Sequence, residues 1–392
     1  MAPARARPLL SHGDGQVQEC PPVPASAAAQ RQVERAIAEL RRGEPVVITD
    51  GEGPGLAVLA IETATAAQLD RCRAAGADAP YLLLTAERAQ DLKIGHKGRA
   101  AVAVAWPRWL DIAGLAAVAD PTYDLAVPFK GPLRRLDMPP TNAMHAALAL
   151  AKLAQLLPAV IALPLPGGGR TGGWAAAQDM MVVDAAALLR HEDRLAQALR
   201  PVVSAHVPLA GAADARVHAF RPADGGAEHL AIVIGDPPRH APVLTRLHSE
   251  CLTGDLLGSL KCDCGDQLRG AIAAIGAAGA GVLLYLAQEG RGIGLMNKLR
   301  AYALQDQGFD TIDANTKLGF RADERQFAPA AAMLKALGFT RIRLMTNNPE
   351  KVAGLRAQGL EVVERVPHQF PANAHNQGYL ATKKSRAGHL LD

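Results

Sequence analysis

Residues 281–308 read GVLLYLAQEGRGIGLMNKLRAYALQDQG and contain one complete strand–loop–helix unit. The run GVLLYLA is almost entirely apolar, which predicts a strand buried on both faces of a sheet. The glycine-rich segment at 288–294 predicts a short connecting loop. The remaining residues have the length of a helix and end at Gly308, a residue type that terminates helices. Such a unit is typical of α/β folds.

The rest of the second half of the chain repeats this alternation. Apolar runs at 229–235 and 342–348 predict two further strands. Helices are expected at 267–279, 330–338 and 349–359. We therefore expect an α/β fold with mixed (α+β) sheets that contain at least some parallel strand pairs.

The front half alternates less regularly. A helix is expected from Val33 to Gly43, where glycine ends the apolar periodicity. Further helices are expected at 66–76 and 143–157, and 180–199 predicts a short strand followed by a helix. The other segments with clear signals are the strands 45–49, 56–62 and 159–165 and the glycine-rich loop 166–173.

The length of 392 residues predicts two domains, each large enough to bury its own core. The N-terminal MAPARARPLL is Arg-rich and acid-poor, as in a targeting peptide, but no clean apolar segment follows it. We therefore expect residues 1–28 to form a disordered tail. The domains are placed at 29–205 and 206–392, with the segment 201–214 as their junction.

The composition excludes several classes of protein. Apolar residues make up 49% and charged residues 20% of the chain, as in ordinary globular proteins. Aromatic residues make up 4%, and no long Lys/Arg block occurs, so no nucleic-acid partner is expected. The net charge of +4 suits a small anionic ligand. No uncharged apolar window is long enough for a transmembrane helix, and we expect a cytoplasmic location without membrane association.

Three of the five cysteines lie in HSECLTGDLLGSLKCDCGD at 248–266. In a reducing compartment such a cluster indicates a metal site, and thiolates favour zinc. Cys262 and Cys264 are two residues apart, so in an extended segment both face one side, and the preceding glycines let Cys251 return to the same ion. Three ligands with an open fourth position is the simplest arrangement. The alternatives are a closed site completed by His248 or by a distant histidine, and a set of inert buried thiols.

Three thiolates around Zn²⁺ would leave a negatively charged centre. Such a centre needs a nearby base or cationic groups that bind the substrate. The sequence offers QEGRGIG at 288–294, RADERQF at 321–327 and MTNNPEKV at 345–352.

These segments, together with HSECLTGD, CDCG, NKLRAYALQDQG, DTIDAN, LGFRADER, LMTNNPEK and ERVP, resemble the GTP cyclohydrolase II family. The likeness runs in register from Arg246 to the closing GHLL and covers nearly half the chain. It implies zinc-dependent hydrolysis of GTP, in which zinc-activated water opens the imidazole ring, C8 leaves as formate and the outer phosphates leave as pyrophosphate. The product would be 2,5-diamino-6-(5-phospho-ribosylamino)pyrimidin-4(3H)-one, for riboflavin biosynthesis. The family also implies a homodimer.

The resemblance assigns roles residue by residue. The three clustered cysteines correspond to the zinc ligands. Arg325 corresponds to a nucleophile toward the α-phosphorus, although a guanidinium that stays protonated suits a phosphate clamp equally. Asp323 corresponds to a proton acceptor, and Tyr302 to a tyrosine that favours complete removal of the formyl group. The expected contacts to GTP, whose charge Mg²⁺ would share, are Arg246, Leu247, His248, Ser249, Glu250, Gln267, Glu289, Gly290, Arg291, Thr311, Thr346 and Lys351.

The front half resembles 3,4-dihydroxy-2-butanone 4-phosphate synthase, on VERAIAELRRGEPVVITD, AALALAKLAQLLPAVIAL and MMVVDAAALLRHEDR. Where that family has an acidic run that holds Mg²⁺, this chain has DGEGPGLAVLAIE, whose carboxylates near the strand are Asp50 and Glu52. The family's Gly-His-Thr-Glu stretch appears as PTNAMH at 140–145. We therefore expect a degenerate synthase-like domain without catalysis of its own.

Other functions remain open at this stage. A zinc nucleobase deaminase would explain His-x-Glu beside the cysteines, but that class requires P-C-x-x-C and the chain has C-D-C. A catalytically silent GTP sensor would keep the zinc as a structural ion. A GTP cyclohydrolase II-like enzyme that stops at the formamide, or that serves another pathway, is also compatible with the sequence.

Overall fold

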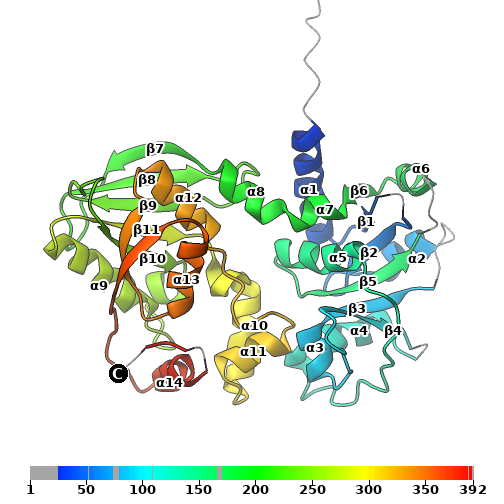
Figure 1. Cartoon of the computed structure of the whole chain (residues 1–392). Coiled ribbons are helices and arrows are strands. Elements are labelled where there is room, and N and C mark those ends of the chain that lie inside the picture. The colour runs from blue at the N-terminus through cyan, green and yellow to red at the C-terminus, as the bar shows by residue number, and fades with distance from the viewer. Residues whose placement is uncertain are drawn as a thin grey trace, which may run out of the picture.

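The computed structural model describes residues 25–51, 53–73, 79–107, 109–165, 170–386 and 388–390. These residues form two halves, each built on one sheet with helices packed against it (Figure 1). The mixed α/β fold class expected from the sequence is confirmed. Most of the tail expected at 1–28 lies outside the described residues, whereas residues 25–28 form the first turn of a helix instead. No helix in the described ranges is long and apolar enough to cross a membrane.

The front sheet has six strands in the order β4-β3-β5-β2-β1-β6. Its β1–β6 pair is parallel, and the other pairs are antiparallel. Side chains alternate between two buried layers: Val47 and Leu59 face one layer, while Val46 and Val58 face the other. The strands are β1 (Val46–Thr49), β2 (Leu56–Ala60), β3 (Tyr81–Thr85), β4 (Ala101–Ala105), β5 (Ala159–Pro164) and β6 (Met181–Asp184).

Helices cover both faces of this sheet. One layer is formed with α1 (Ala25–Arg42), α5 (Asn142–Leu153) and α7 (Ala185–Leu189). The other layer contains side chains of α2 (Ala66–Arg73), α3 (Ala86–Asp91), α4 (Ile112–Ala119) and α6 (Arg170–Ala177). The short helix η1 (Pro121–Tyr123) follows α4, and α8 (His191–Ala198) leads to the second half.

The second sheet has seven strands in the order β13-β12-β10-β11-β9-β8-β7. The strands from β13 to β11 in this order pair in parallel. The pairs β11–β9, β9–β8 and β8–β7 are antiparallel. The carboxyl ends of β10, β11 and β12 therefore meet at one edge, where mixed and parallel sheets place ligands. The strands are β7 (Arg200–His206), β8 (Ala215–Arg221), β9 (His229–Ile234), β10 (Val243–Ser249), β11 (Gly281–Leu286), β12 (Arg341–Met345) and β13 (Glu361–Val366).

Most helices of the second half occupy the expected segments. Two helices, α10 (Leu295–Asp306) and α11 (Thr311–Lys317), lie between the halves, with α11 beside α3 (Figure 1). The others are α9 (Cys264–Ala277), α12 (Ala328–Ala336), α13 (Pro349–Ala357) and α14 (Gln377–Ser385). The helices α9, α10, α12 and α13 occupy the expected segments, whereas α11 and α14 were not predicted.

Two local predictions are wrong. The glycine-rich segment predicted as a loop contains α6, because Ala175 is fully buried in the front core and this packing overrides weak helix propensity. The junction predicted at 201–214 begins with β7, whose β-branched Val202 and Val203 suit an edge strand paired with β8. The boundary placed at 205/206 thus falls at the end of a strand of the second sheet.

Candidate active site

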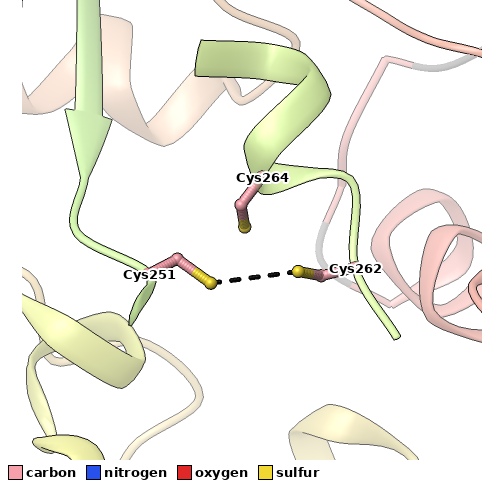
Figure 2. A group of neighbouring side chains, drawn as sticks. All are labelled: Cys251, Cys262 and Cys264. Atoms are coloured by element: carbon pink, nitrogen blue, oxygen red, sulfur yellow. Dashed lines mark hydrogen bonds between the residues drawn. The ribbon is translucent and has the colours of Figure 1, made fainter. Parts of the chain in front are cut away.

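The three clustered cysteines converge beyond the end of β10 (Figure 2). Their sulfur atoms all lie within 4.8 Å of one another, and the Sγ atoms of Cys251 and Cys262 are 3.8 Å apart. The extended C-x-C segment expected from the sequence is not observed. Cys264 is instead the first residue of α9, so a helix start directs its thiol toward the other two.

The surroundings of the sulfurs fit a bound metal ion. The backbone N–H of Gly254 and the ammonium of Lys298 donate to Cys251 Sγ at 3.3 and 3.1 Å, respectively. Hydrogen bonds from the two neighbouring thiols and from Lys298 hold the pKa of Cys251 well below its usual range. A Cβ on Gly254 would lie 2.8 Å from Cys262 Sγ, so the glycine leaves the sulfurs the space they occupy. A ready thiolate in a close-packed set of three thiols is what zinc requires.

His248 does not join the cysteines. Its Nε2 lies 3.0 Å from Asp255 Oδ1, and its Nδ1 has no hydrogen-bond partner among the described residues. Burial lowers the pKa of His248, which keeps the ring neutral at neutral pH. The carboxylate of Asp255 also accepts from Tyr285 Oη and from the backbone N–H of Cys251. The potential metal ligands that cluster in the described part of the chain are the three cysteines.

Two buried cations, Arg246 and Lys351, and the partly buried Arg325 line the same cavity as the thiols. Arg246 on β10 donates to the carbonyl of Met345 at 2.9 Å, and Lys351 on α13 donates to the carbonyl of Leu247 at 2.9 Å. Burial lowers the pKa of Arg246 to about 10, and burial followed by repulsion from Arg325 and Arg246 lowers the pKa of Lys351 well below its usual range. Like charges brought together out of water favour an anionic ligand.

Arg325 is the third of these cations. Its Nε donates to Asp323 Oδ1 at 2.9 Å, and its backbone N–H donates to the same oxygen at 3.0 Å. Burial alone would lower the pKa of Arg325, but the Asp323 carboxylate outweighs burial and raises it. The guanidinium therefore stays protonated, and in this form it is a hydrogen-bond donor and a poor nucleophile.

One face of α10 closes the cavity beside the thiols. Lys298 Nζ donates to Glu289 Oε1 at 2.8 Å as well as to Cys251. Tyr302, one turn further along, has its hydroxyl 3.3 Å from Thr253 Oγ1. Burial raises the pKa of Tyr302 to about 12, so its hydroxyl keeps its proton at neutral pH. This face thus offers one ammonium and one phenol next to the cysteines.

The loop after β11 adopts a left-handed turn. Gly290 and Arg291 have φ angles of 62° and 61°, and the second of these values is costly for any residue but glycine. The turn lets Glu289 Oε2 accept from the backbone N–H of Leu252 at 2.7 Å, in the loop that carries the first cysteine. Strain at this position is consistent with a functional constraint on the guanidinium.

The structure brings the predicted site residues together from seven motif segments. All of them line the cavity except Asp323 and Leu247. Asp323 lies behind Arg325, and Leu247 contributes its carbonyl to Lys351.

Several residues at the site were not predicted from the sequence. Lys298 lies within a recognised motif, but its contact with a cysteine depends on how α10 is placed. Lys383 on α14 forms a buried ion pair at 2.8 Å with Asp263, the residue between two of the cysteines. His389 also lines the cavity, and burial followed by repulsion from Lys383 lowers its pKa to about 3. The C-terminal segment carries no local pattern that would have revealed these contacts.

A mixed α/β chain with a thiol cluster and cations around one cavity has the groups of a metal-dependent enzyme that acts on an anionic ligand. The GTP cyclohydrolase II family matches residues 200–367. The chain is 50% identical over 384 residues to "GTP cyclohydrolase-2" of Azospirillum brasilense, and the match covers 97% of this chain and 100% of the relative. The chain belongs to the GTP cyclohydrolase II family.

One further relative and one solved structure are also similar to this chain. A "GTP cyclohydrolase-2" of Azotobacter vinelandii is 59% identical over 175 residues, which cover 45% of this chain and 84% of that protein. Among solved structures, RibBX, described as a two-domain 3,4-dihydroxy-2-butanone 4-phosphate synthase from A. baumannii, matches with a TM-score of 0.32 at 17% identity. That match covers 86% of this chain and 99% of the solved one.

Proposed function

We propose that this GTP cyclohydrolase II, an enzyme class of riboflavin biosynthesis, uses zinc to hydrolyse GTP to formate, pyrophosphate and 2,5-diamino-6-(5-phospho-ribosylamino)pyrimidin-4(3H)-one. One observation carries the proposal: a single cavity holds the thiol cluster together with the cations Arg246, Arg325 and Lys351. A purine nucleoside triphosphate has a ring to be opened and a polyanionic triphosphate. The thiol cluster suits the first and the cations suit the second.

The thiol side of the cavity would take the guanine ring. Cys251, Cys262 and Cys264 would hold Zn²⁺, which as a Lewis acid makes a coordinated water more acidic. Lys298 donates to Cys251, and this charge reduces the excess negative charge of three thiolates. The protonated hydroxyl of Tyr302 is available to hold or deliver a proton beside the thiols, which supports complete deformylation over a reaction that stops at the formamide.

The cationic side would take the triphosphate. Arg325 remains protonated because Asp323 fixes it, so we assign it as a clamp on the α-phosphate rather than as a covalent nucleophile. Arg246 and Lys351 supply further positive charge from β10 and α13. Mg²⁺ would share the remaining phosphate charge, as is usual for nucleoside triphosphates.

The experiment is a product balance on full-length, zinc-loaded protein with GTP and Mg²⁺, with formate and pyrophosphate quantified together. Equal amounts of both support the proposal. Pyrophosphate without formate would favour the formamide-stalled enzyme, and neither product would favour a silent GTP sensor. Cys264→Ser should abolish formate release while GTP binding remains measurable by calorimetry. Cys72→Ser, which alters a buried thiol in the front half, should leave formate release intact.

We also propose a cytoplasmic homodimer. Reduced thiols at the site suit a reducing compartment. Large apolar side chains next to the cysteine loop support a second copy as partner: Leu256, Leu257 and Met296 are 73%, 70% and 65% exposed. Sedimentation velocity on the full-length chain tests this assembly, and a monomer at micromolar concentration would argue against it.

A further inference from the structure

The front half buries part of the second half in its own core. Six apolar side chains from the segment after β11 belong to the core layer formed with α3 and α4, and each is at most 5% exposed. They are Ile293, Ala301, Leu304, Ala314, Leu318 and Phe320. Helices α10 and α11, which lie between the halves in Figure 1, therefore pack into the core of the front half.

Helix α10 presents opposite faces to the two halves. Lys298 and Tyr302 are four residues apart and face the cysteines, whereas Arg300 lies between them on the other side of the helix. Arg300 Nη2 donates to Glu62 Oε1 at 2.8 Å, and its Nε donates to Asp120 Oδ2 at 2.9 Å. Two carboxylates from separate front-half segments thus fix one guanidinium, and through it the rotation of the helix about its axis.

The loop that carries Asp323 and Arg325 is also tied to the front half. Glu324, the residue between them, is nearly buried and accepts from Lys152 Nζ on α5 at 2.5 Å. Its backbone N–H donates to the carbonyl of Arg291 at 3.2 Å, in the strained turn that also borders the cavity. Burial alone would raise the pKa of Glu324. Its partners Arg321 and Lys152 outweigh burial and lower this pKa, so the carboxylate is charged.

These two contacts reach the site from residues outside the cavity. Lys152, Glu62 and Asp120 do not line it, yet each binds a residue one or two positions from a residue that does. Arg300 is two residues from both Lys298 and Tyr302, and Glu324 is adjacent to Arg325. Misplacement of catalytic groups by about 1 Å can cost about 100-fold in rate, so such supports affect catalysis without touching substrate.

We infer that the front half positions the cyclohydrolase site, with Lys152 acting through Glu324 on the phosphate clamp and with Glu62 and Asp120 acting through Arg300 on α10. They are positioning residues, and the inference rests on the proposed function. The front half is thereby given a role in GTP turnover although none of its described residues lines the cavity.

The test replaces Lys152 by Met in the full-length, zinc-loaded protein and measures kcat and KM for pyrophosphate release from GTP. The expected result is a kcat about tenfold lower with KM within about twofold, because Arg246 and Lys351 still bind the phosphates while Arg325 loses its alignment. Lys152→Arg, which restores the charge, should recover kcat to within about threefold of the wild type.

A matched control breaks an ion pair inside the front half. Arg71 Nη2 lies 2.6 Å from Glu44, away from the second half, and Arg71→Met should leave kcat unchanged. The inference is overturned if Lys152→Met has the wild-type kcat, or if its loss only follows a smaller folded fraction measured by circular dichroism. It is also overturned if Lys152→Arg does not recover kcat. A wild-type protein that releases neither product would refute the proposed function itself, which separates the two failures.

Discussion

Replacing Gly254 by Ala should weaken zinc binding through steric conflict alone. Gly254 lies in the π-helical turn η2 (Leu252–Leu256), and its φ is not in the left-handed region, so alanine meets no backbone penalty there. The new Cβ would lie 2.8 Å from Cys262 Sγ, 3.0 Å from Cys251 Sγ and 3.0 Å from Cys264 Cβ. Ordinary contacts between such atoms are about 3.5–4.0 Å, so all three ligand residues must move apart.

The size of the effect follows from this overlap. Overpacking a close-packed site costs about 1–3 kcal/mol. If the ligands spread to relieve it, the zinc dissociation constant should rise by about 5- to 150-fold, since 1.4 kcal/mol corresponds to a factor of ten. Part of this free-energy cost will lower the stability of the fold rather than the zinc affinity. The thermal unfolding midpoint of the zinc-free protein is therefore measured in parallel.

The assay is competition for zinc against a chromophoric chelator, which reports affinity independently of activity. Gly378→Ala in α14 is the control, because no atom lies within 4 Å of its added Cβ and its φ is not positive. The reasoning is refuted if Gly254→Ala binds zinc within twofold of the wild type while the protein remains folded.

Two other predictions concern the cavity. Tyr302→Phe removes the hydroxyl beside Thr253, and formate release should fall at least about tenfold while pyrophosphate release continues; a parallel loss of both products would contradict its role in deformylation. For Asp323, burial alone would raise the pKa, but Arg325 outweighs it and lowers the pKa below the unfolded value of about 3.9. The pair therefore stabilises the fold above that pH, and the stability is lost as pH falls through the folded pKa. In urea unfolding at pH 7, 4 and 3, the free energy of unfolding should fall less on acidification for Asp323→Asn than for the wild type. Identical pH profiles of the two proteins would contradict a stabilising ion pair.

The site was largely predictable because its motifs follow parallel strands. Cys251 follows β10, Gly290 follows β11 and Lys351 follows β12, and parallel strands end at one edge. The resemblance of the motifs to the family indicated which segments meet, and the parallel strands give the physical reason. The cysteine spacing predicted a thiol cluster correctly but for the wrong local reason, because α9 begins at Cys264 where an extended segment was expected.

Other features had no local signal. Lys383 reaches Asp263 across 120 residues of sequence, and Lys152 reaches Glu324 across 172. Neither lysine stands in a pattern that distinguishes it from an exposed one. The strand β7 was missed for a related reason, since its side chains are all exposed and show no alternation between buried and polar positions.

The sequence by itself determined the chemistry of the site: which thiols can share an ion, which cations can meet a phosphate, and which strands and helices carry them. The thiol cluster and most of the strands and helices follow from spacing, residue type and periodicity, which act over a few residues, and the cations follow from the resemblance of their motifs to the family. The tertiary structure alone decided that the front half holds the helix with Lys298 and Tyr302 and the loop with Arg325. That arrangement depends on burial of apolar side chains and on ion pairs between segments far apart in the chain, and such contacts exist only once the two halves have packed together.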